Sequence, residues 1–330
     1  MPQLKGSISL LWRRLKYELT PEPSQGPRSL VVKLPPELLL QIADHLNLYD
    51  QIQFSQTCVW LHSLLHINSA AEIAALTYQK RLEFFHAASL RRPQSWVCPK
   101  CVYLHHLEQA GVPSQITWVI KACQKKNMPN IYGPYDLHER HIQLALKLSQ
   151  TDFRNANQEY LTKLMKPYTR RSHWPPISGL TPGSSTVMQD FVAVPRIIDG
   201  SFLVQFSMEF FGVIGRCIVY EDLDGTRICP HMEVRPRRHP RSLTRLEISA
   251  QVAFTSGKVQ QGWCGYCLTD YTVKVENGRV KICAWQDFGG QRPPMHHEWT
   301  SLTTEGHRNR YREPLYFESG LAKERFLSEG

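Results

Sequence analysis

Apolar residues recur at helical spacing in the segment 34–65, where Leu38, Ile42 and Leu46 follow one another by four positions. Pro35 and Pro36 end any preceding helix, and a proline is tolerated in the first turn of a new one. Asp50 and Gln53 match a capping-box pattern. We expect a short helix, a turn at residues 47–50 with Asp50 as the next N-cap, and further short helices.

The second half of the chain changes to an alternating pattern that is typical of strands. Residues 202–211 are rich in β-branched and aromatic side chains, and residues 245–254 follow as a second predicted strand. The clearest alternation spans residues 271–284 and is interrupted only by Asn277 and Gly278. This dipeptide favours a two-residue turn, so we predict a β-hairpin.

One further helix is predicted over residues 134–150. Asp136 and Glu139 match a capping box at its start. His141 falls on the apolar side of this helix, where a buried core histidine is the commoner outcome. A Pro-, Gly-, Ser- and Arg-rich stretch, residues 166–187, is the best candidate for a linker.

These patterns predict an α+β protein, with a small helical bundle first and a mixed helical and antiparallel strand-rich region after it. The expected divisions are an N-terminal arm (1–33), a helical module (34–75), a helical region with a cysteine turn (76–165), the linker (166–187), a strand-rich region (188–300) and a C-terminal tail (301–330).

Composition restricts the class of protein. The 330 residues allow about two domains, and 42% hydrophobic residues are enough for a core. We expect no membrane partner, because no run is long and apolar enough to span a bilayer. The formal charge of +10 is compatible with nucleic acid or acidic partners, and its densest cluster is the Pro-interrupted loop 235–241.

Cysteine and histidine spacing indicates metal. The N-terminus lacks the features of a signal peptide, so the nine cysteines suggest reduced thiols in the cytoplasm and/or nucleus. Two close pairs in the strand-rich region supply four donors, which suit a closed structural zinc site. The predicted ligands are Cys229, His231, Cys264 and Cys267.

A second, weaker set of donors surrounds a Cys-x-x-Cys turn. Cys98 and Cys101 form a sound pair, whereas the remaining donors are ambiguous among Cys123 and several downstream histidines. The predicted set is Cys98, Cys101, His105 and Cys123. Unliganded reduced cysteines remain the alternative at both places.

Other chemistry is less well supported. The sequence Trp-Cys-Gly-Tyr-Cys at 263–267 is one residue from a thioredoxin motif, but that chemistry needs the first cysteine at a helix N-terminus. The run 296–298, His-His-Glu, could ligate metal but follows two prolines and is expected in a solvated tail. Because no phosphate loop, nucleophile elbow or paired metalloprotease histidines occur, we do not expect an enzyme.

The order of residues in the first module resembles the F-box. Leu-Pro-x-Glu-Leu-Leu at 34–39, followed by Ile42, Leu46, Leu48 and Asp50, is similar to the family consensus; Asn47 stands where the family often has proline, and Trp60 is one position early. The resemblance implies docking on the Skp adaptor of a cullin-RING ubiquitin ligase. By motif position, the residues that it assigns to docking are Leu34, Pro35, Glu37, Leu38, Ile42 and Leu46.

The wider pattern, including Cys-Pro-His at 229–231 and Cys-x-x-Cys-Leu-Thr-Asp-Tyr at 264–271, resembles a group of fungal F-box domain-containing proteins. The resemblance implies an adaptor that recruits an unidentified protein target for ubiquitination. The alternative is a zinc-stabilised, basic nucleic-acid-binding protein, which the charge permits but does not favour.

Overall fold

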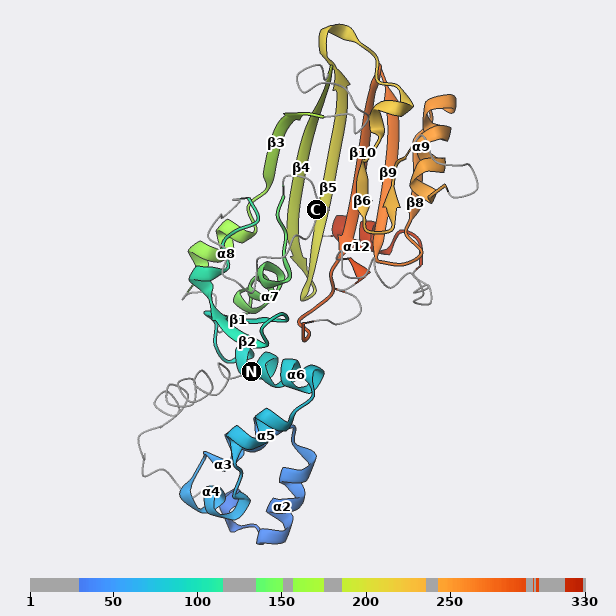
Figure 1. Ribbon diagram of the computed structural model, residues 1–330. Coiled ribbons are helices and arrows are strands. Elements are labelled where there is room, and N and C mark those ends of the chain that lie inside the picture. Colours follow the sequence, from blue (N-terminus) through green and yellow to red (C-terminus); the bar gives the residue numbers. More distant parts are fainter. Residues whose placement is uncertain are drawn as a thin grey trace. The chain divides into compact units, whose positions relative to one another are not determined.

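The computed structural model describes residues 30–114, 135–150, 157–174, 186–235, 243–294, 299, 301–302 and 318–328. The chain divides into two compact units, residues 1–91 and 92–330 (Figure 1). The first unit is helical and the second is strand-rich, which confirms the predicted α+β class. The boundary lies later than the predicted end of the first module, since one more long helix belongs to the first unit.

The first unit consists of short helices joined by tight turns. In chain order they are η1 (Leu30–Lys33), α2 (Pro36–His45), α3 (Leu48–Ser55), α4 (Val59–Leu65), α5 (Ser69–Ala75) and α6 (Tyr78–Leu90). Their buried side chains come mainly from one face of each helix, as with Leu39 in α2, Ile52 in α3 and Leu82 in α6.

The cap between α2 and α3 differs from the prediction. Asn47, and not Asp50, is the N-cap of α3: its side-chain oxygen accepts a hydrogen bond from the Asp50 backbone N–H at 3.0 Å. The Asp50 carboxylate accepts a bond from the Asn47 amide at 2.7 Å in return. The helix therefore begins at Leu48, because asparagine caps as well as aspartate does and stands in extended backbone at the right place.

The second unit is built around one large sheet with smaller elements around it. They are β1 (Ser95–Cys98), β2 (Tyr103–His106), η2 (Leu107–Gln109), α7 (Glu139–Leu148), α8 (Gln158–Leu164), β3 (Tyr168–His173), β4 (Val187–Ile198), β5 (Ser201–Gly212), η4 (Val213–Gly215), η5 (Tyr220–Leu223), β6 (Arg227–Cys229), β7 (Met232–Glu233), α9 (Arg245–Ser256), β8 (Gln260–Trp263), β9 (Thr269–Glu276), β10 (Arg279–Asp287) and α12 (Leu321–Leu327).

The large sheet has six antiparallel strands in the order β3-β4-β5-β10-β9-β8. Asn277 and Gly278, with φ of 51° and 71°, join β9 to β10, so the predicted hairpin is confirmed. Strands β1 and β2 form a separate two-stranded sheet, as do β6 and β7.

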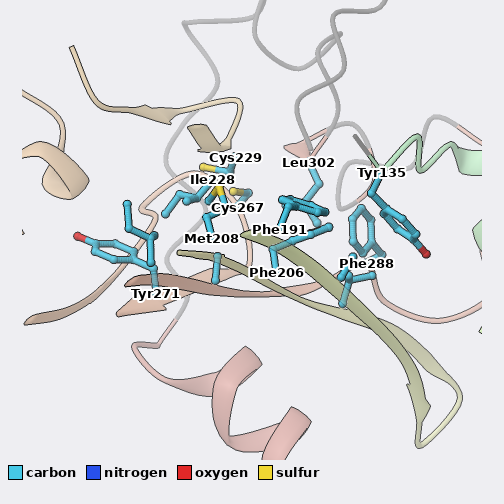
Figure 2. Packing of buried hydrophobic residues seen from close by; sticks show 14 of the residues in the cluster. Tyr135, Phe191, Phe206, Met208, Ile228, Cys229, Cys267, Tyr271, Phe288 and Leu302 are labelled. Atoms are coloured by element: carbon cyan, nitrogen blue, oxygen red, sulfur yellow. The ribbon is translucent and has the colours of Figure 1, made fainter. Parts of the chain in front are cut away.

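The core of the second unit lies on one face of this sheet. Phe191, Phe206 and Met208 alternate with outward-facing residues along β4 and β5, and they pack with Tyr135 and Leu302 (Figure 2). Buried residues of α7 and α9 belong to the same cluster. On the opposite face a smaller cluster joins strand residues to Ala322 and Phe326 of α12.

Two predicted segments have a different structure. Residues 245–254, predicted as a strand, form α9, because Thr244 and Glu247 cap each other reciprocally and Leu246, Ala250 and Ala253 bury at helical spacing. The predicted linker 166–187 includes β3, which pairs with β4 at the edge of the sheet. Its polar composition suits an edge strand with one solvated face.

Two further predictions need smaller corrections. The helix predicted over residues 134–150 begins only at Glu139, and Asp136 forms an ion pair with His138 at 2.9 Å instead of a capping box. The predicted tail 301–330 contributes α12, whose apolar spacing is too brief to stand out in the sequence.

Candidate docking surface and metal centres

Helix α2 divides its apolar side chains between the interior and the solvent. Leu39 and Ala43 face the helical core, whereas Leu38 and Ile42, one turn apart on another side, are 44% and 40% exposed. Of the other residues that the motif assigns to docking, Pro35 and Glu37 are exposed, and Leu34 and Leu46 are half-buried. The bundle therefore does not hide this set within its own core.

Sequence reasoning missed further exposed apolar side chains of the first unit, which lie on other elements or on another side of α2. Leu40 and Val31 are each 42% exposed, and Val59 and Trp60 of α4 are 83% and 39% exposed. The available signal was the run Leu38-Leu39-Leu40, because three consecutive apolar residues cannot all face inward from one helix. We call Leu38 and Ile42, together with the flanking motif residues Leu34, Pro35, Glu37 and Leu46, the docking face.

Partly buried hydrogen bonds tie the end of α2 to α3. The side-chain amide of Gln51 in α3 donates to the backbone carbonyls of Ala43 and Leu46, both at 3.0 Å. These carbonyls lie at the C-terminus of α2, where orphan acceptors need partners. The exposed side chains thus sit on a helix whose end is tied to its neighbour.

Four donors meet in the second unit, as their spacing predicts. The ligand atoms of Cys229, His231, Cys264 and Cys267, here called the C-terminal quartet, all lie within 4.8 Å of one another. Cys229 ends β6 and His231 precedes β7, while Cys264 and Cys267 flank the turn from β8 to β9. Figure 2 shows the sulfurs of Cys229 and Cys267 close together beside Ile228.

The backbone of the β8–β9 turn positions the two thiols. Cys264 N–H donates to the Thr269 carbonyl at 2.8 Å, and Thr269 N–H donates to the Cys267 carbonyl at 2.8 Å. A Cβ atom added at Gly265 in this turn would have no neighbouring atom within 4 Å. The His231 Nδ1 atom lies 3.6 Å from Cys264 Sγ, so the imidazole completes the group from the β6–β7 hairpin.

Burial and mutual hydrogen bonding decide the charge of the quartet. Burial raises the pKa values of Cys229 and Cys267, whereas hydrogen bonds from these two thiols lower the pKa of Cys264. Three buried sulfurs within 4.8 Å of one another cannot all be thiolates without a compensating positive charge. A divalent cation would supply the missing compensation, and thiolate and imidazole donors suit zinc.

The position of Cys264 argues against thioredoxin-like redox chemistry. Strands lie on both sides of the Cys-x-x-Cys turn, so Cys264 is not at a helix N-terminus. The helix dipole that activates the first cysteine in such enzymes has no counterpart here.

Three donors of the weaker set also meet. The ligand atoms of Cys98, Cys101 and His105, here called the N-terminal trio, lie within 4.8 Å of one another on the β1–β2 hairpin. A hydrogen bond from Cys101 lowers the pKa of the Cys98 thiol to about 4. Cys123 lies outside the described residues.

The downstream histidines have other roles. His141 is buried in the core, as the sequence suggests; its Nε2 lies 3.0 Å from the Ala110 carbonyl, and its Nδ1 accepts the His138 backbone N–H at 3.1 Å. Burial lowers its pKa, so the ring is held neutral. His138 instead pairs with Asp136.

Two further candidate features lie largely outside the described residues. They are the histidine pair and Glu298 at 296–298, and residues 236–241 of the basic loop. Arg235, the described start of that loop, is paired with Glu233, which also binds Arg227.

The F-box domain model matches residues 32–64 of the chain. This stretch contains α2 and α3, overlaps η1 and α4, and includes the whole docking face. Proteins with an F-box are generally adaptors of SCF-type ubiquitin ligases rather than enzymes, and the match supports this general role. Comparison with curated proteins and with solved structures finds no match.

Among the residues that the structure describes, no helix combines the length and the apolar character needed to cross a bilayer.

Proposed function

We propose that this protein is the substrate-recognition adaptor of an SCF-type ubiquitin ligase. It would dock on a Skp adaptor through the docking face and recruit a protein target for ubiquitination. The observation that carries the proposal is the coincidence of the F-box match at 32–64 with apolar side chains that the bundle leaves in solvent. Its resemblance to the fungal group of such proteins agrees with this role.

Docking through these side chains has a simple physical basis. An amphipathic helix that lays exposed apolar residues into a groove gains their removal from water, roughly 1.5–3 kcal/mol for each fully buried side chain. Leu38 and Ile42 lie one turn apart and can enter the same groove. Pro35 and Glu37 lie at the start of the same helix, and Leu34 and Leu46 flank it.

The second unit is the part proposed to capture the target. It has a core on one face of the six-stranded sheet and a smaller apolar cluster on the other, so it can present a surface without support from the F-box helices. The target itself is an unidentified protein. Reduced cysteines in both metal groups would place the adaptor in the cytoplasm and/or nucleus.

We further propose that the C-terminal quartet holds a structural zinc ion. Four Cys and His donors form a closed set without a position for substrate. Zinc would link the β6–β7 hairpin to the β8–β9 turn, two segments that the sequence separates by more than thirty residues. It would thereby stabilise a region whose strands β6 and β7 are very short.

The adaptor proposal is tested by co-purification of the full chain with a Skp adaptor. The test variant is Leu38→Asp/Ile42→Asp, which places two carboxylates on the docking face. A matched control is Ile248→Asp/Val252→Asp on α9, where the pair has the same helical spacing and is 49% and 40% exposed. Circular dichroism checks that both variants remain folded.

We expect a stable complex with the intact chain and with the α9 control. The F-box variant should bind at least about 100-fold more weakly, because docking would place two charged carboxylates in an apolar groove without partners, which costs several kcal/mol. A folded intact chain that forms no complex would refute the proposal. Equal binding by the F-box variant would refute the assignment of the docking face.

The nucleic-acid alternative gives a different result in the same preparations. It predicts binding to nucleic acid whose affinity falls steeply as salt is raised, because phosphate contacts release counterions. The structure offers it less support than the adaptor role, since Arg235 at the start of the basic loop is already paired with Glu233.

A further inference from the structure

We propose that the N-terminal trio is a second zinc centre, formed independently of the C-terminal quartet. Cys98, Cys101 and His105 would be its protein ligands, and a donor from outside the β1–β2 hairpin would complete the coordination. This centre goes beyond the adaptor role and does not depend on it.

The donors already have the proximity that a metal requires. Cys101 Sγ lies 3.0 Å from His105 Nε2, and the sulfur of Cys98 lies within 4.8 Å of both atoms. The trio and the quartet are separate groups with no donor in common. Two sulfurs and one imidazole nitrogen are borderline-soft donors, which select zinc over calcium or magnesium.

The turn between the strands adopts an unusual conformation that brings the two cysteines together. Val102 has a φ of +55°, although β-branched residues rarely enter the left-handed region. Its backbone N–H donates to the Cys98 carbonyl at 2.9 Å, which closes the turn around Pro99 and Lys100. Such strain persists where surrounding interactions impose it and is enriched at ligand-binding sites.

The histidine ring is also oriented before any metal arrives. His105 lies directly opposite Trp96 in the hairpin register, and the two rings stack with centroids 4.7 Å apart and planes 20° from parallel. The Trp96 indole N–H donates to the His106 carbonyl at 3.3 Å, which fixes the indole. The stacked imidazole then directs Nε2 toward Cys101.

Helix α7 packs against the hairpin. The Gln143 side-chain amide donates to the Val97 carbonyl and accepts the Val97 backbone N–H, both at 3.0 Å. The Gln143 side chain thus bonds both backbone groups of Val97, as a neighbouring strand would, and fixes the position of β1 next to the cysteine turn. The ligands are therefore attached to a fixed element, as a metal centre needs.

The test counts zinc in the full chain, purified under reducing conditions and dialysed against metal-free buffer. Cys98→Ser/Cys101→Ser removes two ligands of the trio. Cys217→Ser/Cys283→Ser is the matched control, because these two cysteines belong to neither group. Elemental analysis gives the zinc-to-protein ratio, and co-purification with a Skp adaptor is scored separately on the same preparations.

We expect the Cys98→Ser/Cys101→Ser variant to lose one zinc ion per chain relative to the intact protein, and the control to lose none. An unchanged zinc content in the first variant would overturn the proposal.

A second variant covers the case in which the double variant fails to fold. His105→Cys keeps three donors and adds a thiolate. In the cobalt-substituted protein it should retain the metal and increase the near-ultraviolet thiolate-to-cobalt absorption. A spectrum identical to that of the cobalt-substituted intact protein would show that residue 105 does not ligate the ion, and would overturn the assignment.

Discussion

At the scale of single residues, Lys147 is the most heavily buried charged group near the hairpin. Its side chain in α7 is only 1% exposed and its ammonium donates to the Ser95 carbonyl. Burial lowers its pKa to about 7 from an ordinary value of 10.5. The unfolded chain therefore keeps this proton over a pH range in which the folded chain has released it.

This difference predicts that stability rises with pH. Between pH 7 and about 10 the unfolded state binds up to one proton more than the folded state, so the free energy of unfolding should increase by up to ~1.4 kcal/mol per pH unit. Lys147→Met should remove this contribution. Denaturant unfolding at pH 7, 8 and 9 measures it, and intact and Lys147→Met proteins with parallel pH dependence would contradict the expectation. The exposed Lys163→Met is the control.

Gln143 supplies a second prediction at this scale. Gln143→Leu keeps the volume of the side chain but leaves the N–H and carbonyl of Val97 without their present partner. We expect a loss of about 2–4 kcal/mol in the unfolding free energy of the second unit, because buried unsatisfied groups cost roughly 1–3 kcal/mol each. Gln150→Leu, at an exposed position, should change stability by less than about 0.5 kcal/mol. Similar values for the two variants would contradict this account.

Individual residues were predictable where their chemistry is encoded locally. Spacing alone identified the C-terminal quartet and the burial of His141. The sequence predicts Asp50 as the N-cap of α3 where the structure has Asn47, because both residues cap well and only the backbone conformation distinguishes them. The left-handed conformation of Val102 was unpredictable, since it opposes the intrinsic preference of valine.

At the scale of elements, α12 shows how a distant side chain can start a helix. The carboxylate of Asp270 in β9 accepts backbone N–H groups of Gly320 at 2.9 Å and Lys323 at 3.0 Å. Phe326 then packs on the sheet cluster and lies under the Arg196 guanidinium at 4.6 Å. The helix is thus anchored at both of its ends.

Removing this anchor should release α12 from the sheet. Asp270→Ala should cost about 1–2 kcal/mol, the usual value of a lost cap, and should speed amide hydrogen exchange in residues 321–327. Asp190→Ala removes a carboxylate whose partner, Arg171, is well exposed, and should cost less than about 1 kcal/mol. Unchanged exchange in α12 of Asp270→Ala would show that packing alone holds the helix.

Elements were predictable where periodicity and turn chemistry agree. The β9–β10 hairpin combines clear alternation with an Asn-Gly turn. The sequence predicts a strand where the structure has α9, because the β-branched and aromatic residues of this segment favour strands. Tertiary burial of Leu246, Ala250 and Ala253 overrides that preference. Strand β3 is a polar edge strand, whose composition resembles that of a linker.

At the scale of the whole molecule, the two units separate the proposed docking and metal-binding functions. The docking face lies entirely in the first unit, and both metal groups lie in the second. Chelation should therefore destabilise only the second unit. Zinc at a large excess over its dissociation constant stabilises by about 4 kcal/mol, so we expect a fall of roughly 8–16 °C in the melting temperature of that unit.

Binding to a Skp adaptor should survive the same chelation. Calorimetry with and without a chelator measures the melting shift, and co-purification measures docking. Loss of both together would indicate that the two units do not fold independently. A melting temperature unaffected by chelation would argue against structural zinc.

The change in hydrophobic period along the chain is enough to predict the division into a helical and a strand-rich part. The order of the strands cannot be predicted from the sequence, because the pairing of β5 with β10 joins segments that are distant in the sequence. No local pattern encodes such a pairing.

The pairing of β5 with β10 also imposes a delay during biosynthesis, because β10 is synthesised well after β5. Residues 213–278 must be translated after β5 before its partner begins to emerge, which takes several seconds at about 5–20 residues per second. During that interval the Phe-rich edge of β5 is an unpaired strand open to association with other chains. All four residues of the C-terminal quartet are synthesised within the same interval. Zinc binding would therefore fold residues 229–267 before β10 is synthesised, and would shorten the time for which that edge of β5 is exposed.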